Sequence, residues 1–411
     1  MIDRKHCEEL DRRDPLAAFR ERFLLPEGVL YLDGNSLGPL PKAVPVRLRE
    51  VVEREWGQGL IRSWNTAHWI DLPQRVGDKI APLVGAGPGE VVAADSTSVN
   101  LFKLLCAALA VAPERRVILS EAGNFPTDLY VAEGVRDLLA RGHELRLVEA
   151  ADLEGAIDEE VAVLMLTHVD FRSGFRHDMS ALTAAAHSKG ALALWDLSHS
   201  AGAMPIALGA AGADLAVGCG YKYLNGGPGA PAFLYVRRDL QDRIRSPLSG
   251  WMGHREPFAF ATSYAPAAGI ARNLCGTPPV LAMAALDAAL DLWAEVDLDA
   301  VRAKSEALAA LFIAAVEERC GDLGVTLASP RAAAQRGSQV SFRHAEGYAV
   351  MQALIARGVI GDFRAPDLIR FGFTPLYQRH VDIFDAALAL VEILRKGLWN
   401  RPEFQARAAV T

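Results

Sequence analysis

The sequence lacks the features that mark several common classes of protein. Its five cysteines are widely spaced and form no C-x-x-C pair, which argues against a disulfide framework or a cysteine zinc site. It contains no run of about 18 apolar residues, so no membrane span is expected. The first residues, MIDRKHCEELDRRDPL, are charged where a signal peptide is apolar. These features predict a cytoplasmic protein.

Motifs of other chemistries are also missing or incomplete. With a net charge of −7 and no basic stripe, the chain is not expected to bind nucleic acid. It has no G-x-S-x-G nucleophile elbow. The segment GAGPGE (85–90) loosely matches a dinucleotide motif, but Pro88 interrupts it, and we interpret it as a turn before a strand, EVVAAD.

One segment offers several metal-ligating side chains without a recognisable spacing. HVDFRSGFRHDM supplies His168, Asp170, His177 and Asp178. Their spacing matches no zinc signature, so we interpret the segment as a solvated loop and expect no metal.

The middle of the chain alternates short apolar runs with amphipathic runs. RVILS (116–120), VAVLML (161–166), ALALWD (191–196) and DLAVGC (214–219) suit strands buried on both faces. Between them, one helix is predicted to end at Gly142, and another to begin at Ser180 as N-cap and stop at Gly190. This rhythm indicates βαβ units and a doubly wound, mostly parallel α/β sheet.

The pattern changes near residue 280, which predicts a second domain. Two long amphipathic helices are followed by a strand candidate, SQVSFRH (338–344), and by a closing helix near 382–396. We predict a large α/β domain over residues 50–280. A smaller α+β domain is predicted over 281–411, completed by the N-terminal segment 1–49.

Polar side chains follow the predicted strands, where ligands of such sheets bind. DSTSVNLFK begins a helix with hydroxyl groups at Ser96, Thr97 and Ser98, which suits either a phosphate or a plain N-cap. After RVILS come Phe125, which suits either a ring face or simple packing, and Asp128, which by position alone favours an N-cap.

The next two strand ends supply an acid and a lysine. Asp196 ends ALALWD, and a carboxylate at the tip of a buried strand is costly unless it is paired, for example with a protonated ring nitrogen. His199 follows three residues later. The plainer alternative is that Asp196 caps the next turn and that His199 is a core histidine. Lys222 follows the last strand in GCGYKYLNGGPGA, about one helix and one strand later. A desolvated lysine is a nucleophile that forms imines with aldehydes. A lysine reaching from a loop to solvent explains the flanking tyrosines and glycines poorly.

Together these groups suit one ligand, pyridoxal 5′-phosphate (PLP), an electron sink for amino-acid carbanions. Its phosphate would lie at the hydroxyl-rich helix start, its ring nitrogen at Asp196, its ring face at Phe125 and its aldehyde at Lys222.

Eight motifs in order along nearly the whole chain resemble the kynureninase family of fold-type-I PLP enzymes, which are related to class V aminotransferases. They are YLDGNSLGPLP (31–41), DSTSVNLFK (95–103), NFPTD (124–128), WDLSHSAG (195–202), YKYLNGGPG (221–229), GWMGH (250–254), GTPP (276–279) and IRFGFTPLY (369–377).

The resemblance implies a role for each matching residue. Lys222, Tyr221 and Asp196 would be catalytic, with Tyr221 also contacting the phosphate and relaying protons. Arg370 would bind the substrate α-carboxylate, and Trp64 the aryl group, with Asn35 and Ser36 in the same pocket. Trp251 and Thr277 would reach across a homodimer interface. The remaining cofactor contacts would be Thr97, Ser98, Phe125, Pro126, Thr127, Asp128, Thr167 and His199.

The implied reaction is hydrolytic cleavage of the Cβ–Cγ bond of L-kynurenine, or its 3-hydroxy form, to anthranilate and L-alanine. It belongs to tryptophan catabolism through the kynurenine pathway, which also serves NAD biosynthesis. Two alternatives stay open: a cysteine desulfurase or selenocysteine lyase of the same fold, for which Cys219 and Cys275 are the nearest candidate nucleophiles, and a non-catalytic PLP-binding protein.

Overall fold

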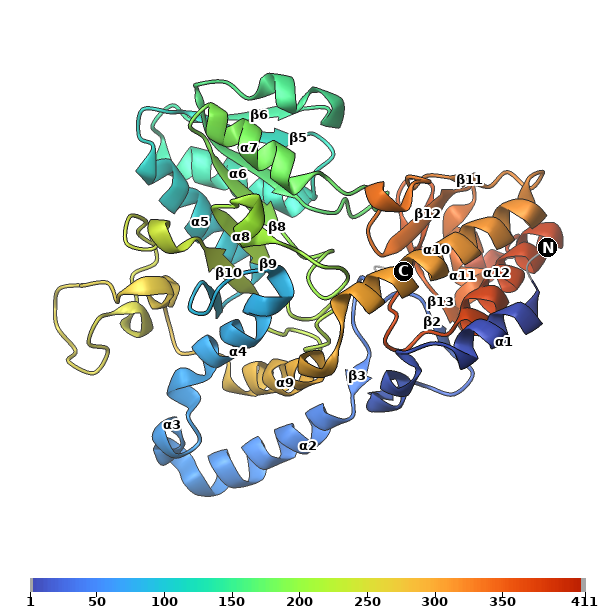
Figure 1. Cartoon of the computed structure of the whole chain (residues 1–411), viewed down its shortest axis with the longest axis horizontal. Helices are drawn as coiled ribbons and strands as arrows, with labels where there is room; N and C mark the ends of the chain where they lie inside the picture. Colours follow the sequence, from blue (N-terminus) through green and yellow to red (C-terminus); the bar gives the residue numbers. More distant parts are fainter. Residues whose placement is uncertain (1–2, 408–411) are drawn as a thin grey trace.

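Two β-sheets in different parts of the chain form the framework of the molecule (Figure 1). The computed structural model describes residues 3–407. The larger sheet contains β4 (Val91–Ala93), β5 (Val117–Glu121), β6 (Glu144–Val148), β7 (Val161–Thr167), β8 (Leu192–Asp196), β9 (Leu215–Gly218) and β10 (Phe233–Val236). Its strand order is β4-β10-β9-β8-β7-β5-β6.

The strands predicted from apolar runs are β5, β7, β8 and β9, and they pair in parallel at the centre of this sheet. Strand β6 adds to the same parallel set, whereas β10 runs antiparallel to both β9 and β4. The doubly wound, mostly parallel sheet expected from the sequence is therefore confirmed. The edge strand β6 and the short internal strand β10 carried no signal that we singled out.

Helices cover both faces of the larger sheet, which explains why its central strands β7, β8 and β9 are almost entirely apolar. In β8, Ala193 and Trp195 pack into one core and Leu194 into another. The first core also receives α4 (Leu72–Ile80), α7 (Met179–Ser188), α8 (Leu208–Ala211) and α9 (Val280–Leu290). The second receives α5 (Thr97–Val111) and α6 (Pro126–Leu139).

The helix ends correct two details of the sequence interpretation. The N-cap of α7 is Asp178, whose side chain accepts a hydrogen bond from the Ala181 N–H, so the assignment of Ser180 was wrong. The stop at Gly190 is confirmed, since this residue adopts a left-handed φ of 75°. Helix α6 ends earlier than predicted, at Leu139, with Gly142 in the turn beyond it.

The smaller sheet lies on the other side of the molecule, against long helices. It contains β11 (Thr326–Leu327), β12 (Gln339–Arg343), β15 (Leu368–Gly372) and β14 (Asp362–Arg364), in that order. Strand β12 and the closing helix match the prediction. Phe312, Phe342, Phe371 and Phe373 join the sheet to the helices α10 (Leu298–Cys320), α11 (Gly347–Ile355) and α12 (His380–Arg395). A short helix, α13 (Pro402–Gln405), lies beyond them.

The N-terminal segment contacts both halves of the molecule. Helix α1 (Arg4–Arg12) lies beside α12, and β2 (Leu30–Tyr31) pairs with β13 (Val359–Ile360) (Figure 1). On either side of β2 in the chain, β1 (Phe23–Leu24) and β3 (Leu40–Pro41) pair with each other. The chain continues through α2 (Ala43–Glu50), a π-helical stretch and α3 (Ser63–Thr66) along the larger sheet's side. Between residues 3 and 407, no helix is both long and apolar enough to span a membrane.

These contacts support the division into a large domain (50–280) and a small one (281–411 with 1–49), which we retain as a proposal. Below, "large domain" and "small domain" mean these two parts.

Gly77 allows α4 to pack directly on β4, and this contact gives a stability prediction. A Cβ at Gly77 would lie 2.3 Å from the Val91 carbonyl oxygen, so Gly77→Ala should force the helix from the strand and destabilise the protein by about 1–3 kcal/mol. Gly134, in the exposed part of α6, has nothing within 4 Å of such a Cβ. Gly134→Ala should instead stabilise by about 0.5–1 kcal/mol. Urea unfolding of both apoproteins measures the difference; equal midpoints would refute this account of Gly77.

Candidate active site

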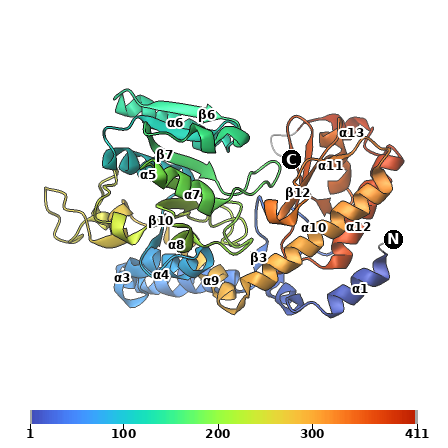
Figure 2. The same ribbon diagram turned by 45° about the horizontal axis from the view of Figure 1, so that its top comes forward.

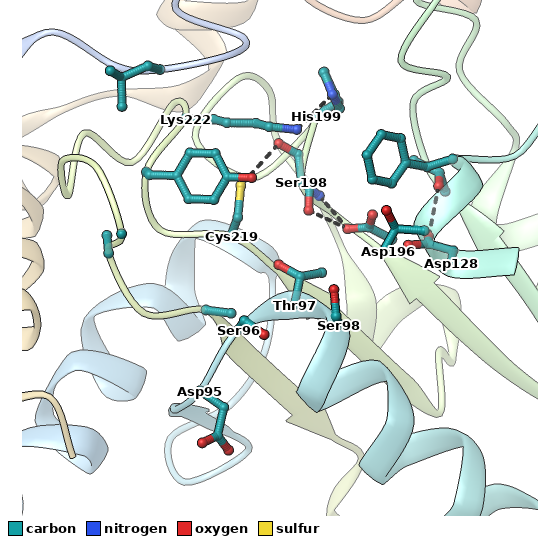
Figure 3. A pocket seen from close by; sticks show the side chains of 18 of the residues that line it. Asp95, Ser96, Thr97, Ser98, Asp128, Asp196, Ser198, His199, Cys219 and Lys222 are labelled. Atoms are coloured by element: carbon teal, nitrogen blue, oxygen red, sulfur yellow. Dashed lines mark hydrogen bonds between the residues drawn. The ribbon is translucent and has the colours of Figure 1, made fainter. Parts of the chain in front are cut away.

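A cavity of about 610 Å³ opens at the carboxyl edge of the larger sheet (Figure 3). It brings together most of the side chains that the sequence placed at strand ends. Predicted site residues that line it are Thr97, Ser98, Phe125, Thr127, Asp128, Thr167, Asp196, His199, Tyr221 and Lys222.

Parallel pairing explains why residues far apart in the chain meet here. Thr167, the last residue of β7, lies in register with Asp196, the last residue of β8. Strand β9 ends next to them at Gly218 and delivers the chain to Lys222. The carboxylate of Asp196 accepts hydrogen bonds from the N–H and the hydroxyl of Ser198, at 2.8 and 2.6 Å.

Asp128 and Asp196 form a buried pair of carboxyl groups. Burial raises the pKa of Asp128 well above its usual value, and the charge of Asp196 adds to the rise. Burial also raises the pKa of Asp196, which is opposed by the Ser198 hydrogen bond and by Lys222. We therefore place a proton on Asp128, which donates a hydrogen bond to ionised Asp196. The N-cap position of α6 belongs to Phe125, so the capping interpretation of Asp128 was wrong.

Lys222 lines the same cavity as these two acids, and its amine contacts the ring of His199. Its Nζ lies 2.8 Å from Nε2 of His199. Burial lowers the pKa of Lys222, although Cys219 and Asp196 oppose the shift. Burial and the neighbouring Lys222 lower the pKa of His199 well below its usual value, so this ring is neutral and can accept a hydrogen bond from the amine. The lowered pKa of Lys222 favours its neutral, nucleophilic form.

The start of α5 supplies the other end of the cavity. Ser96 is its N-cap and accepts a hydrogen bond from the Val99 N–H at 3.3 Å. The hydroxyl groups of Thr97 and Ser98 lie at the cavity wall in front of the helix end (Figure 3). The N-cap interpretation is confirmed at Ser96, and the hydroxyl groups of Thr97 and Ser98 remain beside the free N–H groups of the helix start, where the phosphate site stays a prediction.

Two further features shape the cavity. Phe125 presents its ring there, 37% exposed and edge-to-face with Phe171 at 5.1 Å. Tyr221 also lines the wall, and burial raises the pKa of its hydroxyl.

The backbone of the Lys222 loop is held by the N-terminal segment, because the Gly38 N–H donates to the Tyr221 carbonyl at 2.8 Å. A Cβ on Gly38 would come within 2.2 Å of the Lys222 carbonyl oxygen.

The predicted substrate residue Arg370 lies outside the residues lining this cavity, in a charged cluster. It is 1% exposed and directs Nε and Nη2 at the carboxylate of Asp362. Its Nη2 also donates to the Ser36 hydroxyl at 2.9 Å, and Asn35 lies against the same guanidinium. Arg364 contacts Asp362 from the other side at 2.9 Å. Arg370, Asn35 and Ser36 are thus gathered as predicted, with Asp362 as a partner that the sequence did not reveal.

Trp64, Trp251 and Thr277 are also absent from the lining of this cavity. The rings of Trp64 and Trp251 lie edge-to-face at 6.0 Å, and Trp251 continues to Phe258 at 5.7 Å. Thr277 is exposed. Pro126 is the first residue of α6, next to the cavity-lining Phe125.

The segment that we interpreted as a solvated loop is instead partly buried. His168 and His177 are about 95% buried, and His177 lies 2.8 Å from a carboxylate oxygen of Glu121. Burial lowers the pKa of His168 to about 3. Within the described part of the chain, no group of three or more His, Cys, Asp or Glu side chains could hold a metal ion.

The donor set of the cavity fits PLP by its chemistry. It offers the amine of the partly buried Lys222, the buried carboxylate of Asp196, an aromatic face and a helix start with free hydroxyl groups. Ser198, which also lines the cavity, carried no sequence signal beyond its place after a strand end, whereas Cys219 lines it as one of the two candidate thiols named above.

Comparisons with known proteins agree with this geometry. A family model for the kynureninase C-terminal domain matches residues 301–390. The chain is 56% identical to a kynureninase of Burkholderia pseudomallei (strain 1106a) and 55% identical to one of Pseudomonas fluorescens, over the full length of both chains in each case.

Solved structures show the same fold at low sequence identity. An apo cysteine desulfurase from Thermococcus onnurineus NA1 superposes with a TM-score of 0.77 and 20% identity, covering 92% of this chain and 98% of that one. A mutant of C-DES with glycine covalently linked to its PLP cofactor superposes with a TM-score of 0.75 and 17% identity, covering 95% and 100%.

The raised pKa of Asp128 predicts a pH-dependent effect of its removal. A carboxyl group with a pKa raised by folding favours the folded state most below its unfolded pKa, and this contribution is lost as pH rises through the folded pKa. Asp128→Asn should therefore change the apoprotein's Tm little near pH 4 and raise it by a few degrees toward pH 8. Asp137→Asn, on the exposed side of the same helix, is the control, because Arg136 lowers the pKa of Asp137. Parallel Tm profiles for the two variants would contradict the assignment.

Proposed function

The chain belongs to the kynureninase family of PLP-dependent hydrolases, and on this premise we propose that its cavity binds PLP through Lys222 and Asp196. Lys222 would bind the aldehyde carbon, and ionised Asp196 would hold the proton on the pyridine nitrogen. Protonated Asp128 supports this role, because its hydrogen bond keeps Asp196 ionised despite burial.

The phosphate would lie at the start of α5. The helix dipole and free N–H groups favour an anion there, and the Thr97 and Ser98 hydroxyls add donors. Phe125 would cover one face of the ring, and Tyr221, from the Lys222 loop, would donate to the phosphate. Thr127, Pro126 and Thr167 would complete the wall beside Asp128.

We propose that the substrate is L-kynurenine or its 3-hydroxy form, consumed in tryptophan catabolism in the cytoplasm. Water adds its oxygen to the γ-carbonyl carbon, the Cβ–Cγ bond breaks, and a proton goes to Cβ, which yields anthranilate and L-alanine. PLP, when bound, supplies an electron sink for the negative charge that develops on the amino-acid carbons.

The chain's own groups would move the protons. Lys222, whose pKa is lowered by burial, would remove the α-proton, and His199 would hold the amine through Nε2. Tyr221 keeps its proton near neutral pH because burial raises its pKa, so it is suited to deliver a proton late in the reaction.

Arg370 would bind the substrate α-carboxylate, and its surroundings say how. The carboxylate of Asp362 accepts hydrogen bonds from both Nε and Nη2 of Arg370. A substrate carboxylate must therefore share Arg370 with Asp362, or displace the Asp362 carboxylate toward Arg364. Asp33 adjoins this cluster, and burial and Asp362 raise its pKa to about 7. A proton on Asp33 would reduce the negative charge that an incoming carboxylate meets.

Neither of the two candidate thiols suits the cysteine desulfurase alternative, and Cys275 does not line the cavity. Cys219 lies in the cavity wall, but it is 3% exposed and donates to the Ser198 carbonyl. Burial raises its pKa, which keeps it a thiol. A non-catalytic PLP-binding protein would have no use for a buried guanidinium beside the cofactor pocket.

The observation that carries the proposal is the buried Lys222 amine facing Asp196 across one cavity. PLP added to the protein and then reduced with borohydride should become fixed on the peptide that contains Lys222, as read by mass spectrometry. Lys222→Ala should lose this label and reduce the formation of fluorescent anthranilate from L-kynurenine by at least about 1000-fold. The exposed Lys189→Ala is the matched control and should behave as wild type. Labelling without anthranilate would refute the substrate and leave the cofactor site standing.

We further propose a homodimer in which Trp251, Thr277 and Trp64 complete the partner's site. An apolar surface around α2 and α3 supports it, with Trp56, Leu60 and Ile61 between 56% and 78% exposed. Next to it lies an apolar cavity of about 480 Å³ lined by Trp69, Trp56 and the start of α9. Such a surface is typical of a subunit interface, and two-fold symmetry would place the distant aromatic residues against the partner's cavity.

Mixing inactive variants tests this arrangement. Lys222→Ala and Trp251→Ala proteins, each weakly active alone, should recover about a quarter of wild-type activity when co-expressed, because a mixed dimer has one intact site. The matched pair of Lys222→Ala with Asp196→Ala should recover none, since both residues line the same cavity. Absence of recovery in the first pair, with the mixed dimer isolated, would show that Trp251 acts within its own subunit.

A further inference from the structure

A small-domain residue, Gln339, reaches the hydrogen-bond network of Lys222. Gln339 begins β12, on the side of the small domain that faces the large sheet (Figures 1 and 2). Along this strand Val340 and Phe342 pack into the small-domain core, whereas Gln339 and Ser341 point the other way. Gln339 is fully buried, and its side chain spans the two domains.

The hydrogen bonds of the Gln339 amide fix its orientation. Its Nε2 donates to the carbonyl oxygens of Asp170 and Phe171, at 3.1 and 3.0 Å. Backbone carbonyls only accept, so the amide cannot be turned round without placing oxygen against oxygen. Its Oε1 is thereby held toward Nδ1 of His199, at 3.1 Å.

This orientation determines the tautomer of His199. An amide oxygen only accepts, so the proton of the neutral ring must be on Nδ1. The lone pair of Nε2 is then free to accept a hydrogen bond from the Lys222 amine, 2.8 Å away. With the other tautomer, Nε2–H would donate to the amine and stabilise its neutral form.

The same network extends to the arginine cluster. The Phe171 carbonyl that accepts from Gln339 also accepts from Nη1 of Arg370. One backbone carbonyl therefore joins the amide that orients His199 to the predicted carboxylate-binding arginine.

We propose that Gln339 is a positioning residue for the reaction: it holds His199 in the Nδ1–H tautomer, so that Nε2 accepts a hydrogen bond from the Lys222 amine. The proposal rests on the role of Lys222 given above. If this proposal holds, the pKa of the Lys222 amine depends on the position of the small domain, because Gln339 belongs to that domain. None of the eight motifs that carry the family resemblance includes Gln339.

Other charged groups around the pair remain in place when Gln339 is changed. Asp196 and Cys219 raise the pKa of Lys222, and Arg370 and Arg364 lower it. The same two arginines and Lys222 lower the pKa of His199. The effect of the neutral substitution Gln339→Leu is therefore measured against a constant electrostatic background.

Two measurements on the apoprotein test the proposal independently of activity. Nitrogen-15 NMR of histidine-labelled protein reports the tautomer, with the His199 signals identified by their loss in His199→Asn. Trace acetylation followed by mass spectrometry of the Lys222 peptide reports the pH at which this amine becomes reactive.

The variants are Gln339→Leu, Gln339→Glu and the control Ser341→Ala, which removes only a hydrogen bond from the same strand to the Arg172 carbonyl. Gln339→Leu should lose the pure Nδ1–H tautomer and lower the acetylation midpoint of Lys222 by about one pH unit. Gln339→Glu should keep the proton on Nδ1 and raise the midpoint, because a carboxylate makes Nε2 a stronger acceptor. Ser341→Ala should match wild type in both.

The outcomes separate this inference from the proposed function. An unchanged tautomer and midpoint in both Gln339 variants would overturn the role of Gln339 while leaving Lys222 as the PLP-binding residue. If Gln339→Leu does not fold, the His199 tautomer in Gln339→Glu decides alone, and a proton on Nε2 there would overturn the proposal. Loss of borohydride labelling at Lys222 in wild type would overturn the proposed function itself.

Discussion

The site depends on keeping charged groups buried at one edge of a parallel sheet. Lys222, Asp196 and Asp128 are removed from water together, and each is tolerated only because another lies within reach. The apolar strands β7, β8 and β9 bring them there, and their register places Thr167 next to Asp196. The same burial that makes these groups costly lowers the pKa of Lys222 and so favours its neutral, nucleophilic form.

Several elements close around this edge from outside the sheet. The N-terminal segment holds the Lys222 loop through the hydrogen bond of Gly38, and β12 holds His199 through Gln339. The segment between β7 and α7 contributes the Phe171 carbonyl to both Gln339 and Arg370. The chemistry is thus placed in the large domain, whereas its fine adjustment comes from the N-terminal segment and the small domain.

Within one subunit, part of the expected site lies away from the cavity. Trp64 and Trp251 contact each other away from the cavity, next to an apolar surface on α2 and α3. A two-fold partner would use both features at once, since it would cover the apolar surface and receive the aromatic side chains. Because a single interface would account for both the apolar surface and the displaced aromatic residues, we propose a dimer in which each subunit contributes to the partner's site.

The sequence by itself determined the parallel sheet, because uninterrupted apolar runs suit strands buried on both faces. It also determined the order of polar groups at the strand ends, and hence Lys222, Asp196 and the hydroxyl groups of α5, because in such sheets those ends meet. Two predictions of helix caps were wrong. The N-cap of α7 is Asp178 and not Ser180, and Asp128 is a buried partner of Asp196 and caps no helix.

Only the tertiary structure decided which residues join the site from distant elements. Gln339 and Asp362 lie on small-domain strands and carry no local signal, since their partners are hydrogen bonds and charges brought close by packing. The two histidines interpreted as solvated were buried for the same reason, because contacts with a second domain cover a segment that reads as a polar loop.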